Sequence, residues 1–332
     1  MTDFRLDTVR LGADGPLVGH QGFGAMAINT GYYGPTDEAA ARATLEQALE
    51  VGVTLFDTAD AYGDGANEQF LAPFLAAHRD EVVIATKFGL GRIRRTGEIV
   101  NDAASIRAAA DASLRRLGVD HLDVYYMHRR NVEVPIEETV GTMAELVREG
   151  KVRHLGLSEV TAEELRTAYG VHPIVAVESE WSLFSRDIEA RVVPAAAELG
   201  VALVPYSPLG RGVLTGAVGQ LGADDARRDM PRFDEDNHAV NQDLLAPLRE
   251  IAAERGVTSA QVALGWLHAQ ERVFGVTVVP IPGTRSSARV VENARGALVE
   301  LSDEELGRLQ LIAAGVAGTR YADMNFTSAG RE

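Results

Sequence analysis

Four polar residues, each close to the end of an apolar run, carry side chains that together could move a proton. They are Asp57, Tyr62, Lys87 and His128. A tyrosine is a poor acid at neutral pH, because its reference pKa is ~10. An ammonium beside Tyr62 would lower that pKa, so Lys87 could make it a usable proton donor, with Asp57 pairing with Lys87 and holding it in place. His128 could orient a carbonyl oxygen. Such a group could protonate an alkoxide while a hydride arrives at carbon.

Lysine is rare in this chain. Only Lys87 and Lys151 are lysines among 32 basic residues, and the others are arginines. Arginine stays charged, and its pKa cannot be tuned as that of lysine can. A lysine in such an arginine-rich chain is therefore a candidate for a role that arginine could not perform. We expect a chemical role for Lys87, whereas Lys151 is expected only to open a strand.

These residues must be positioned by apolar, β-branched segments that alternate with helical patterns. Strands are expected near 22–26 and at 52–58, 81–87, 121–128, 151–158, 174–179, 200–207 and 276–282. They lack a clean polar–apolar alternation, as is typical of parallel strands covered on both faces. Helices are expected at 37–50, 67–78, 105–117, 136–148, 162–168, 188–199, 259–269 and 289–294. Thr36 is expected to cap the first helix, and Thr161 with Glu164 to form a capping box.

Strands that are each followed by a helix predict an α/β fold, a (β/α)8 TIM barrel. An N-terminal β-hairpin is expected between residues 4 and 24, around the turn 13–16, and two extra helices are expected at 243–254 and 303–312. No linker or repeat marks a boundary, so residues 1–332 are expected to form a single domain. The polar stretch 207–240 is expected to be an inserted loop over the site, and 313–332 a C-terminal tail.

A doubly wound Rossmann sheet is the competing architecture. The string GFGAMA at 22–27 matches the dinucleotide-binding pattern G-x-G-x-x-A. The residues that follow, INTGYYGP, cannot form the helix whose N-terminus should hold a pyrophosphate. The barrel is therefore the better prediction.

Composition restricts the class of partner. The net charge is −16 over 332 residues, which argues against a nucleic-acid or anionic-membrane surface. No apolar run approaches the ~20 residues of a membrane span, and the first residues do not resemble a signal peptide. Cysteine is absent, which excludes disulfides, thiolate nucleophiles and cysteine-bound zinc. We expect a soluble, cytoplasmic protein.

In a barrel, functional side chains gather at the C-terminal ends of the strands. The predicted strand ends carry Asp57, Lys87, His128, Ser158, Glu178, Tyr206 and Pro282-Gly283. Each has a structural explanation when taken singly, because an Asp or Ser after a strand often caps the next helix. Together they indicate a reaction centre.

Several segments resemble the aldo-keto reductases. They are FDTADAYG (56–63), ATKFG (85–89), DVYYMHR (123–129), VRHLGLSEV (152–160), VPYSPLGRG (204–212) and IPGTRSSARVVEN (281–293). The resemblance implies a (β/α)8 barrel that binds NADP(H) without a Rossmann domain and reduces aldehydes or ketones to alcohols. It also implies that Asp57, Tyr62, Lys87 and His128 form the catalytic tetrad, with Tyr62 as the general acid/base.

The resemblance places the NADP(H) cofactor as well. Tyr206 matches the residue that stacks on the nicotinamide, and loop 207–212 would wrap the pyrophosphate, with the longer insertion 207–240 covering the cofactor. Arg285 and Arg289 suit the 2′-phosphate. The predicted cofactor residues are Gly24, Met26, Asp57, Ser158, Glu178, Tyr206, Ser207, Pro208, Leu209, Gly210, Arg211, Gly212, Gly283, Thr284, Arg285, Arg289, Glu292 and Asn293.

Two positions depart from the family pattern. Ser158-Glu159 and Glu178 stand where Ser-Asn and Gln commonly hold the nicotinamide carboxamide. Serine followed by glutamate occurs in some branches, but Glu178 is less usual. A carboxylate can accept from the amide NH2 and cannot donate to its oxygen unless it is protonated.

Other readings remain open. The chain could be a regulatory or binding protein on the same barrel, as the potassium-channel β subunits in this family partly illustrate. A metal-dependent hydrolase is weaker, because the eight histidines form no His-x-His or His-x-x-x-His pair. A small aldehyde, ketone or quinone is the expected substrate, and its pocket is expected to include Tyr32, Tyr33, Phe88, Arg129 and Asn325-Phe326. The oligomeric state is not readable from the sequence.

Overall fold

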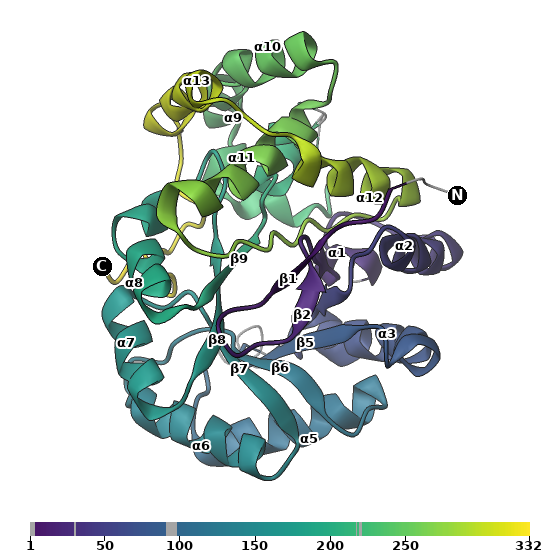
Figure 1. Cartoon of the computed structure of the whole chain (residues 1–332), viewed down its shortest axis with the longest axis vertical. Helices are drawn as coiled ribbons and strands as arrows, with labels where there is room; N and C mark the ends of the chain where they lie inside the picture. The colour runs from purple at the N-terminus through teal and green to yellow at the C-terminus, as the bar shows by residue number, and fades with distance from the viewer. Residues whose placement is uncertain (1–3, 30, 91–97, 217, 219–220) are drawn as a thin grey trace.

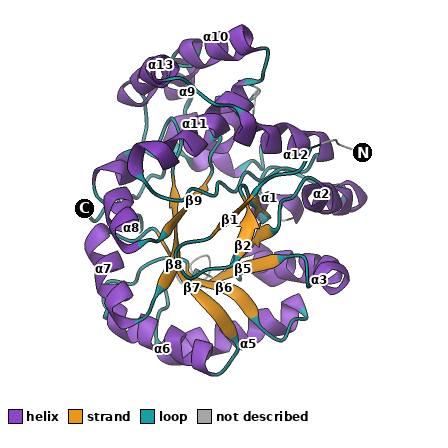
Figure 2. Ribbon diagram, viewed as in Figure 1, coloured by secondary structure: helices purple, strands orange, loops and turns teal. Residues whose placement is uncertain are grey.

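Parallel strands lie at the centre of the molecule, and helices surround them (Figures 1 and 2). The structure is a computed structural model, and it describes residues 4–29, 31–90, 98–216, 218 and 221–332. Seven of the strands form one sheet in sequence order, and each pairs in parallel with the next. They are β3 (Phe23–Gly24), β4 (Leu55–Asp57), β5 (Val83–Phe88), β6 (Leu122–Met127), β7 (Val152–Ser158), β8 (Ile174–Glu180) and β9 (Ala202–Tyr206).

Residues 277–281 close this sheet into a barrel. Leu203 of β9 forms a parallel bridge with Val278, and Ile281 N–H donates to Pro205 O at 3.1 Å. On the other side, Gly22 N–H donates to Pro280 O at 2.9 Å, which joins the segment to the start of β3. The eighth strand, expected at 276–282, is thus reduced to a single bridge, because Pro280 and Pro282 have no N–H for a regular ladder. The predicted (β/α)8 architecture is confirmed.

The helices predicted from the sequence occur in the expected order. The helices of the described residues are α1 (Met26–Asn29), α2 (Glu38–Glu50), α3 (Ala66–His78), α5 (Ala103–Leu117), α6 (Ile136–Arg148), α7 (Ala162–Val171), α8 (Val192–Leu199), α9 (Glu235–Asp243), α10 (Ala246–Arg255), α11 (Ser259–Phe274), α12 (Ser287–Ala294) and α13 (Asp303–Ala314). Of these, α1 and α9 are additional to the prediction. The capping box of Thr161 and Glu164 is present at the start of α7. The cap of α2 differs from the prediction, because the Asp37 carboxylate, and not Thr36, accepts from Ala40 N–H.

The stretch 207–240 is more structured than the expected loop. It contains short 3₁₀ turns at Gly210–Thr215, Ala226–Asp229 and Pro231–Phe233, and α9 begins inside it. Residues 217, 219 and 220 of this stretch lie outside the described residues. The two expected extra helices are present as α10 and α13, which pack against each other.

The N-terminal hairpin covers the end of the barrel where the strands begin. Strands β1 (Thr8–Arg10) and β2 (Leu17–Gly19) pair antiparallel. Leu11 and Val18 pack with side chains of the barrel interior, such as Leu55 and Val124. Ala13 N–H donates to Gly200 O, just before β9. The opposite end of the barrel, where the strands finish, is left for the site.

Apolar packing falls into two clusters. The larger lies between the strands and the surrounding helices, and the smaller fills the barrel interior beneath the site. Within the described ranges, no helix has the length and apolar character needed to cross a bilayer.

Candidate active site

A cavity of about 970 Å³ lies at the C-terminal ends of the strands. Its walls include most of the residues singled out in the sequence. From the tetrad and the predicted cofactor set these are Gly24, Met26, Asp57, Tyr62, His128, Glu178, Tyr206, Ser207, Pro208, Leu209, Arg211, Gly212, Gly283, Thr284, Arg285, Arg289, Glu292 and Asn293. Tyr32, Tyr33, Arg129 and Phe326 from the expected substrate pocket line it too.

Strand alternation explains which side chains reach this cavity. Successive residues of a strand point to opposite faces, so every second residue faces the barrel axis. Leu55 and Ala85 belong to the interior cluster, and Asp57 and Lys87 follow each of them by two residues. Phe88 is one residue further on and faces the helices, where its ring lies 5.0 Å from that of Tyr125. The expectation that Phe88 contacts the substrate is therefore corrected, because this side chain is part of the outer core.

Lys87 is the centre of a buried polar cluster. Its ammonium is completely buried and contacts the Asp57 carboxylate and Thr58 O, the latter at 2.9 Å. The Tyr62 hydroxyl lies 3.5 Å from Lys87 Nζ, although 25 residues separate the two in sequence. Burial by itself would lower the pKa of Lys87, but Asp57 and Glu178 outweigh it and hold that pKa above its usual value. Lys87 therefore stays charged beside Tyr62.

Tyr62 and His128 form the rim of this cluster. Their rings meet edge to face with centroids 5.8 Å apart. Burial raises the pKa of Tyr62, and the opposing effect of Lys87 is smaller. The sequence predicted that Lys87 would lower the pKa of Tyr62. In the protein without ligand the pKa of Tyr62 is raised instead, and Tyr62 is protonated. Burial, followed by the charges of Arg129 and Lys87, lowers the pKa of His128 well below its usual value, so this imidazole is neutral.

Glu178 adds a second carboxylate to Lys87. Its Oε2 lies 3.4 Å from Lys87 Nζ, and the residue is 3% exposed. Two carboxylates then share one ammonium in a nearly dry environment. Burial first, and Asp57 second, raise the pKa of Glu178 to about 8, while Lys87 and Arg129 oppose the rise. This rise in pKa favours the protonated form of Glu178, which has the donor that an ionised carboxylate lacks.

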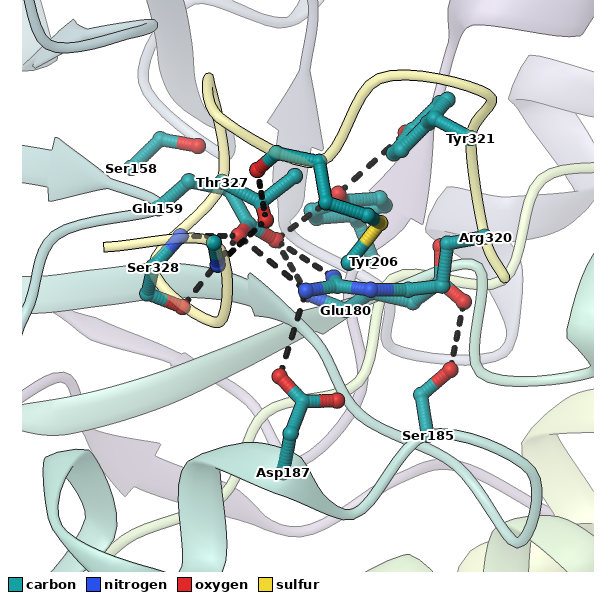
Figure 3. Close-up of polar contacts among 12 residues, drawn as sticks. Ser158, Glu159, Glu180, Ser185, Asp187, Tyr206, Arg320, Tyr321, Thr327 and Ser328 are labelled. Carbon is teal, nitrogen blue, oxygen red and sulfur yellow. Dashed lines mark hydrogen bonds and ion pairs between the residues drawn. The ribbon is translucent and has the colours of Figure 1, made fainter. Parts of the chain in front are cut away.

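Glu159, the other departure from the family pattern, is bound to the C-terminal tail. Figure 3 shows its carboxylate among Tyr206, Arg320 and Ser328. Arg320 Nη1 donates to Oε1 at 2.9 Å, the Tyr206 hydroxyl donates to the same oxygen at 2.8 Å, and Ser328 N–H donates to Oε2 at 3.0 Å. Burial alone would raise the pKa of Glu159, but Arg320 and then Arg129 outweigh it and lower the pKa to about 2. Glu159 is thus an ionised anchor for residues more than 160 positions away.

The anchored tail forms one wall of the cavity, where the sequence predicted Phe326 but not Tyr321. Tyr321 lines it, and Arg211 Nη2 donates to the Tyr321 hydroxyl at 2.8 Å. Phe326 packs on Tyr321, with ring centroids 4.9 Å apart. Asn325, unlike Phe326, does not line the cavity, so the prediction that it contacts the substrate is corrected. No local pattern in 313–332 predicts the contacts of Tyr321, because they depend on the tail returning across the end of the barrel.

The backbone around the cavity is strained. The described non-glycine residues with a left-handed φ are Asp64, Glu159, Ser207 and Arg211, with φ between 48° and 54°. Such conformations cost about 1–3 kcal/mol each and cluster at functional sites. Ser207 and Arg211 fall in the predicted pyrophosphate loop. Gly210 in that loop also has a positive φ, but it packs under Leu214 and does not line the cavity.

Two glycines permit close approach where the barrel closes. A Cβ on Gly283 would lie 2.4 Å from Gly24 O, and one on Gly24 would lie 2.7 Å from Ile281 O. Both residues line the cavity, so the same contact that closes the barrel shapes its wall.

Ser158 and Arg285, which were both predicted to hold the cofactor, contact other parts of the protein. Ser158 does not line the cavity, and its hydroxyl accepts from Arg129 Nη1 at 3.0 Å. Arg285 donates to Tyr33 O, Gly34 O and Pro35 O at 2.8–3.0 Å, and so holds the loop 33–36. Arg289 lies exposed at the cavity wall.

Comparisons with known proteins agree with this architecture. Residues 22–314 match the model of the aldo/keto reductase family. The chain is 39% identical over 327 residues to a probable aldo-keto reductase 1 from Glycine max, covering 97% of this chain and 93% of the relative.

Solved structures give the same result. A glycerol dehydrogenase from Gluconobacter oxydans superposes with a TM-score of 0.80 at 27% identity, covering 96% of this chain and 98% of that one. An aldo-keto reductase from Bacillus halodurans, in its holo form, has a TM-score of 0.77 at 26% identity over 96% of this chain and 100% of that one. The chain therefore belongs to the aldo-keto reductase family, whose members are carbonyl oxidoreductases that use nicotinamide cofactors.

Proposed function

We propose that this protein reduces aldehydes or ketones to alcohols with NADPH, and that Tyr62 supplies the proton. The observation that carries the proposal is the contact of Tyr62 with Lys87, at 3.5 Å, beside a neutral His128 at the wall of the cavity. When bound, the cofactor supplies the hydride.

Each residue of the tetrad has a distinct task in this proposal. His128, being neutral, donates a hydrogen bond to the carbonyl oxygen and directs it toward Tyr62. Tyr62 gives its hydroxyl proton to the developing alkoxide. The charge of Lys87 stabilises the tyrosinate that forms, in a water-poor site where a charge acts strongly. Asp57 keeps Lys87 oriented and is itself 2% exposed.

The residues at the cavity fit a nicotinamide cofactor. Among the described residues, His128 Nδ1 is buried without a hydrogen-bond partner, which is unusual unless a ligand completes the site. Tyr206 offers its face for the nicotinamide, and Ser207–Gly212 offers a strained, glycine-containing turn for the pyrophosphate. Arg289, and Arg285 beside it, would take the 2′-phosphate and favour NADP(H) over NAD(H). A cytoplasmic location stays a prediction from composition.

Carbonyl-dependent oxidation of NADPH, followed over a panel of aldehydes, ketones and quinones, tests the proposal. Tyr62→Phe should lower kcat by the ~10²–10⁴-fold typical of general acid catalysis, with nearly unchanged cofactor affinity. A variant that keeps more than about half of the wild-type turnover would show that Tyr62 is not the proton donor. Failure of wild type to oxidise NADPH with any carbonyl, while it still binds NADPH, would favour the regulatory alternative.

A further inference from the structure

We propose that Arg129 binds a carboxylate on the substrate, so that this protein acts on aldehydes and ketones that carry an acid group. The inference rests on the proposed carbonyl reduction and names its substrate class. Arg129 directly follows His128, lines the cavity and is 5% exposed. Its cation therefore lies beside the point to which His128 would direct the reacting carbonyl.

The guanidinium of Arg129 is held at one nitrogen and leaves an edge available. Nη1 donates to His128 O at 2.7 Å and to Ser158 Oγ at 3.0 Å. Nη2 has a single long contact, 3.4 Å, to the Tyr206 hydroxyl, and the buried Nε has no partner among the described residues. Nε and Nη2 form the side of the guanidinium that can donate two parallel hydrogen bonds to one carboxylate. A buried donor without an acceptor is unfavourable, so a ligand that supplies the acceptor binds more tightly.

Charge pairing distinguishes Arg129 from other buried or part-buried arginines near the site. Arg320 lies 2.9 Å from Glu159, Arg232 lies 3.1 Å from Glu180, and Arg130 lies 3.6 Å from Glu164. All the hydrogen bonds that the Arg129 side chain donates within the described ranges go to uncharged oxygens. Glu159 attracts Arg129, but its oxygens are already taken by Arg320, Tyr206 and Ser328. The cation of Arg129 is therefore left for an incoming anion.

Aromatic rings strengthen this site by keeping water away. Arg129 Cζ lies 5.7 Å from the ring centroid of Tyr206 and 5.6 Å from that of Phe326. Phe326 belongs to the tail that Glu159 anchors, so the anion site is complete only when the tail is in place. An ion pair formed in such surroundings is stronger than one at an exposed surface. This local cation also overcomes the repulsion that a net charge of −16 exerts on an acid.

Matched substrates and variants test the assignment. Steady-state kinetics with NADPH compare 4-oxobutanoate with its methyl ester, for wild type, Arg129→Gln, Arg129→Lys and the control Arg130→Gln. Arg130 is the neighbouring arginine, has its own carboxylate partner and does not line the cavity. Wild type should prefer the acid by about tenfold or more in kcat/KM. Arg129→Gln should lower kcat/KM for the acid by about ten- to hundredfold more than for the ester, as expected for one charge-assisted pair. Arg129→Lys should restore part of the loss, and Arg130→Gln should match wild type.

A binding measurement makes the result independent of turnover. Calorimetry with butanoate, which has no carbonyl to reduce, should show binding to wild type with NADP⁺ and at least about tenfold weaker binding to Arg129→Gln. Equal losses for acid and ester, or equal butanoate affinities for the two proteins, would overturn the anion site. If the ester is reduced but carboxylates gain nothing from Arg129, the inference fails and carbonyl reduction stands. If butanoate binds through Arg129 but no carbonyl is reduced, the anion site stands and the proposed function fails.

Discussion

Arg320 Nη1 lies 2.9 Å from Glu159 Oε1, although the two residues are 161 positions apart in the chain. Arg320 is 3% and Glu159 0% exposed, so this is a buried ion pair. It joins the C-terminal tail to the end of β7, at a residue whose φ of 50° already marks local strain. Glu159 therefore holds one wall of the cavity through a buried charge.

Loss of this pair should release the tail. Removing one partner of a buried ion pair typically costs about 3–5 kcal/mol, because the other charge is left without compensation. Glu159→Gln should therefore lower the melting temperature and speed amide exchange at Thr327 and Ser328, while Glu163→Gln, an exposed neighbour on α7, should change neither. Unchanged exchange in the tail would show that Glu159 is not its anchor.

The pair of Glu159 and Arg320 should hold the tail only above a certain pH. The pKa of Glu159 is lowered to about 2 from 4.5, so its contribution to stability is complete above about pH 4.5 and is lost as the pH falls through about 2. The protection factors of amides in residues 320–328, which are corrected for the pH dependence of intrinsic exchange, should thus be independent of this group from pH 5 to 8 and fall in acid. Release of the tail already near pH 6 would contradict this assignment.

For Glu178 we expect the opposite dependence of stability on pH. Its pKa is raised to about 8, so the folded protein binds this proton more strongly than the unfolded chain, and the associated stability is lost as pH rises from about 4.5 through about 8. Glu178→Gln, which is neutral throughout, should become progressively more stable relative to wild type over that interval. Urea unfolding at several pH values measures this difference, with the exposed Glu38→Gln as control. A difference that does not change with pH would mean that Glu178 is ionised in the folded protein at every pH tested.

Replacement by arginine should have different effects on turnover at the two lysines. Lys87→Arg keeps the charge but introduces a larger, forked group where the ammonium is completely buried. We expect a loss of turnover of about 10²-fold or more, the scale of general acid catalysis. Lys151 is part-exposed and pairs with Asp111 at 2.8 Å, so Lys151→Arg should be nearly neutral. Equal, mild effects on kcat at both positions would remove the special role of Lys87.

Substitution of the two arginines beside the predicted 2′-phosphate site should affect cofactor binding differently. Arg289→Ala should weaken NADPH binding by about ten- to hundredfold and leave NADH binding nearly unchanged, because only the 2′-phosphate is lost as a partner. Arg285→Ala should weaken binding of both cofactors, since Arg285 also holds the loop 33–36. Calorimetric titration of both cofactors against each variant measures these effects. Equal affinity of wild type for NADPH and NADH would show that neither arginine binds the 2′-phosphate.

Short-range patterns in the sequence were sufficient for the framework of this protein. The order of strands and helices, the capping box of Thr161 and Glu164, and the position of Asp57 and Lys87 at strand ends depend on residues a few positions apart. Local periodicity and capping chemistry therefore predict them. Phe88 is the exception, because one residue of strand register decides which face a side chain occupies.

The electrostatic character of the site depended on the tertiary structure. The contact of Glu178 with Lys87, the pairing of Glu159 with Arg320 and the uncompensated cation of Arg129 each join or separate segments that are far apart in sequence. Whether a carboxylate is protonated, or an arginine has a partner, depends on burial and on distances of a few ångströms between those segments. Only the closure of the barrel and the return of the C-terminal tail set these distances.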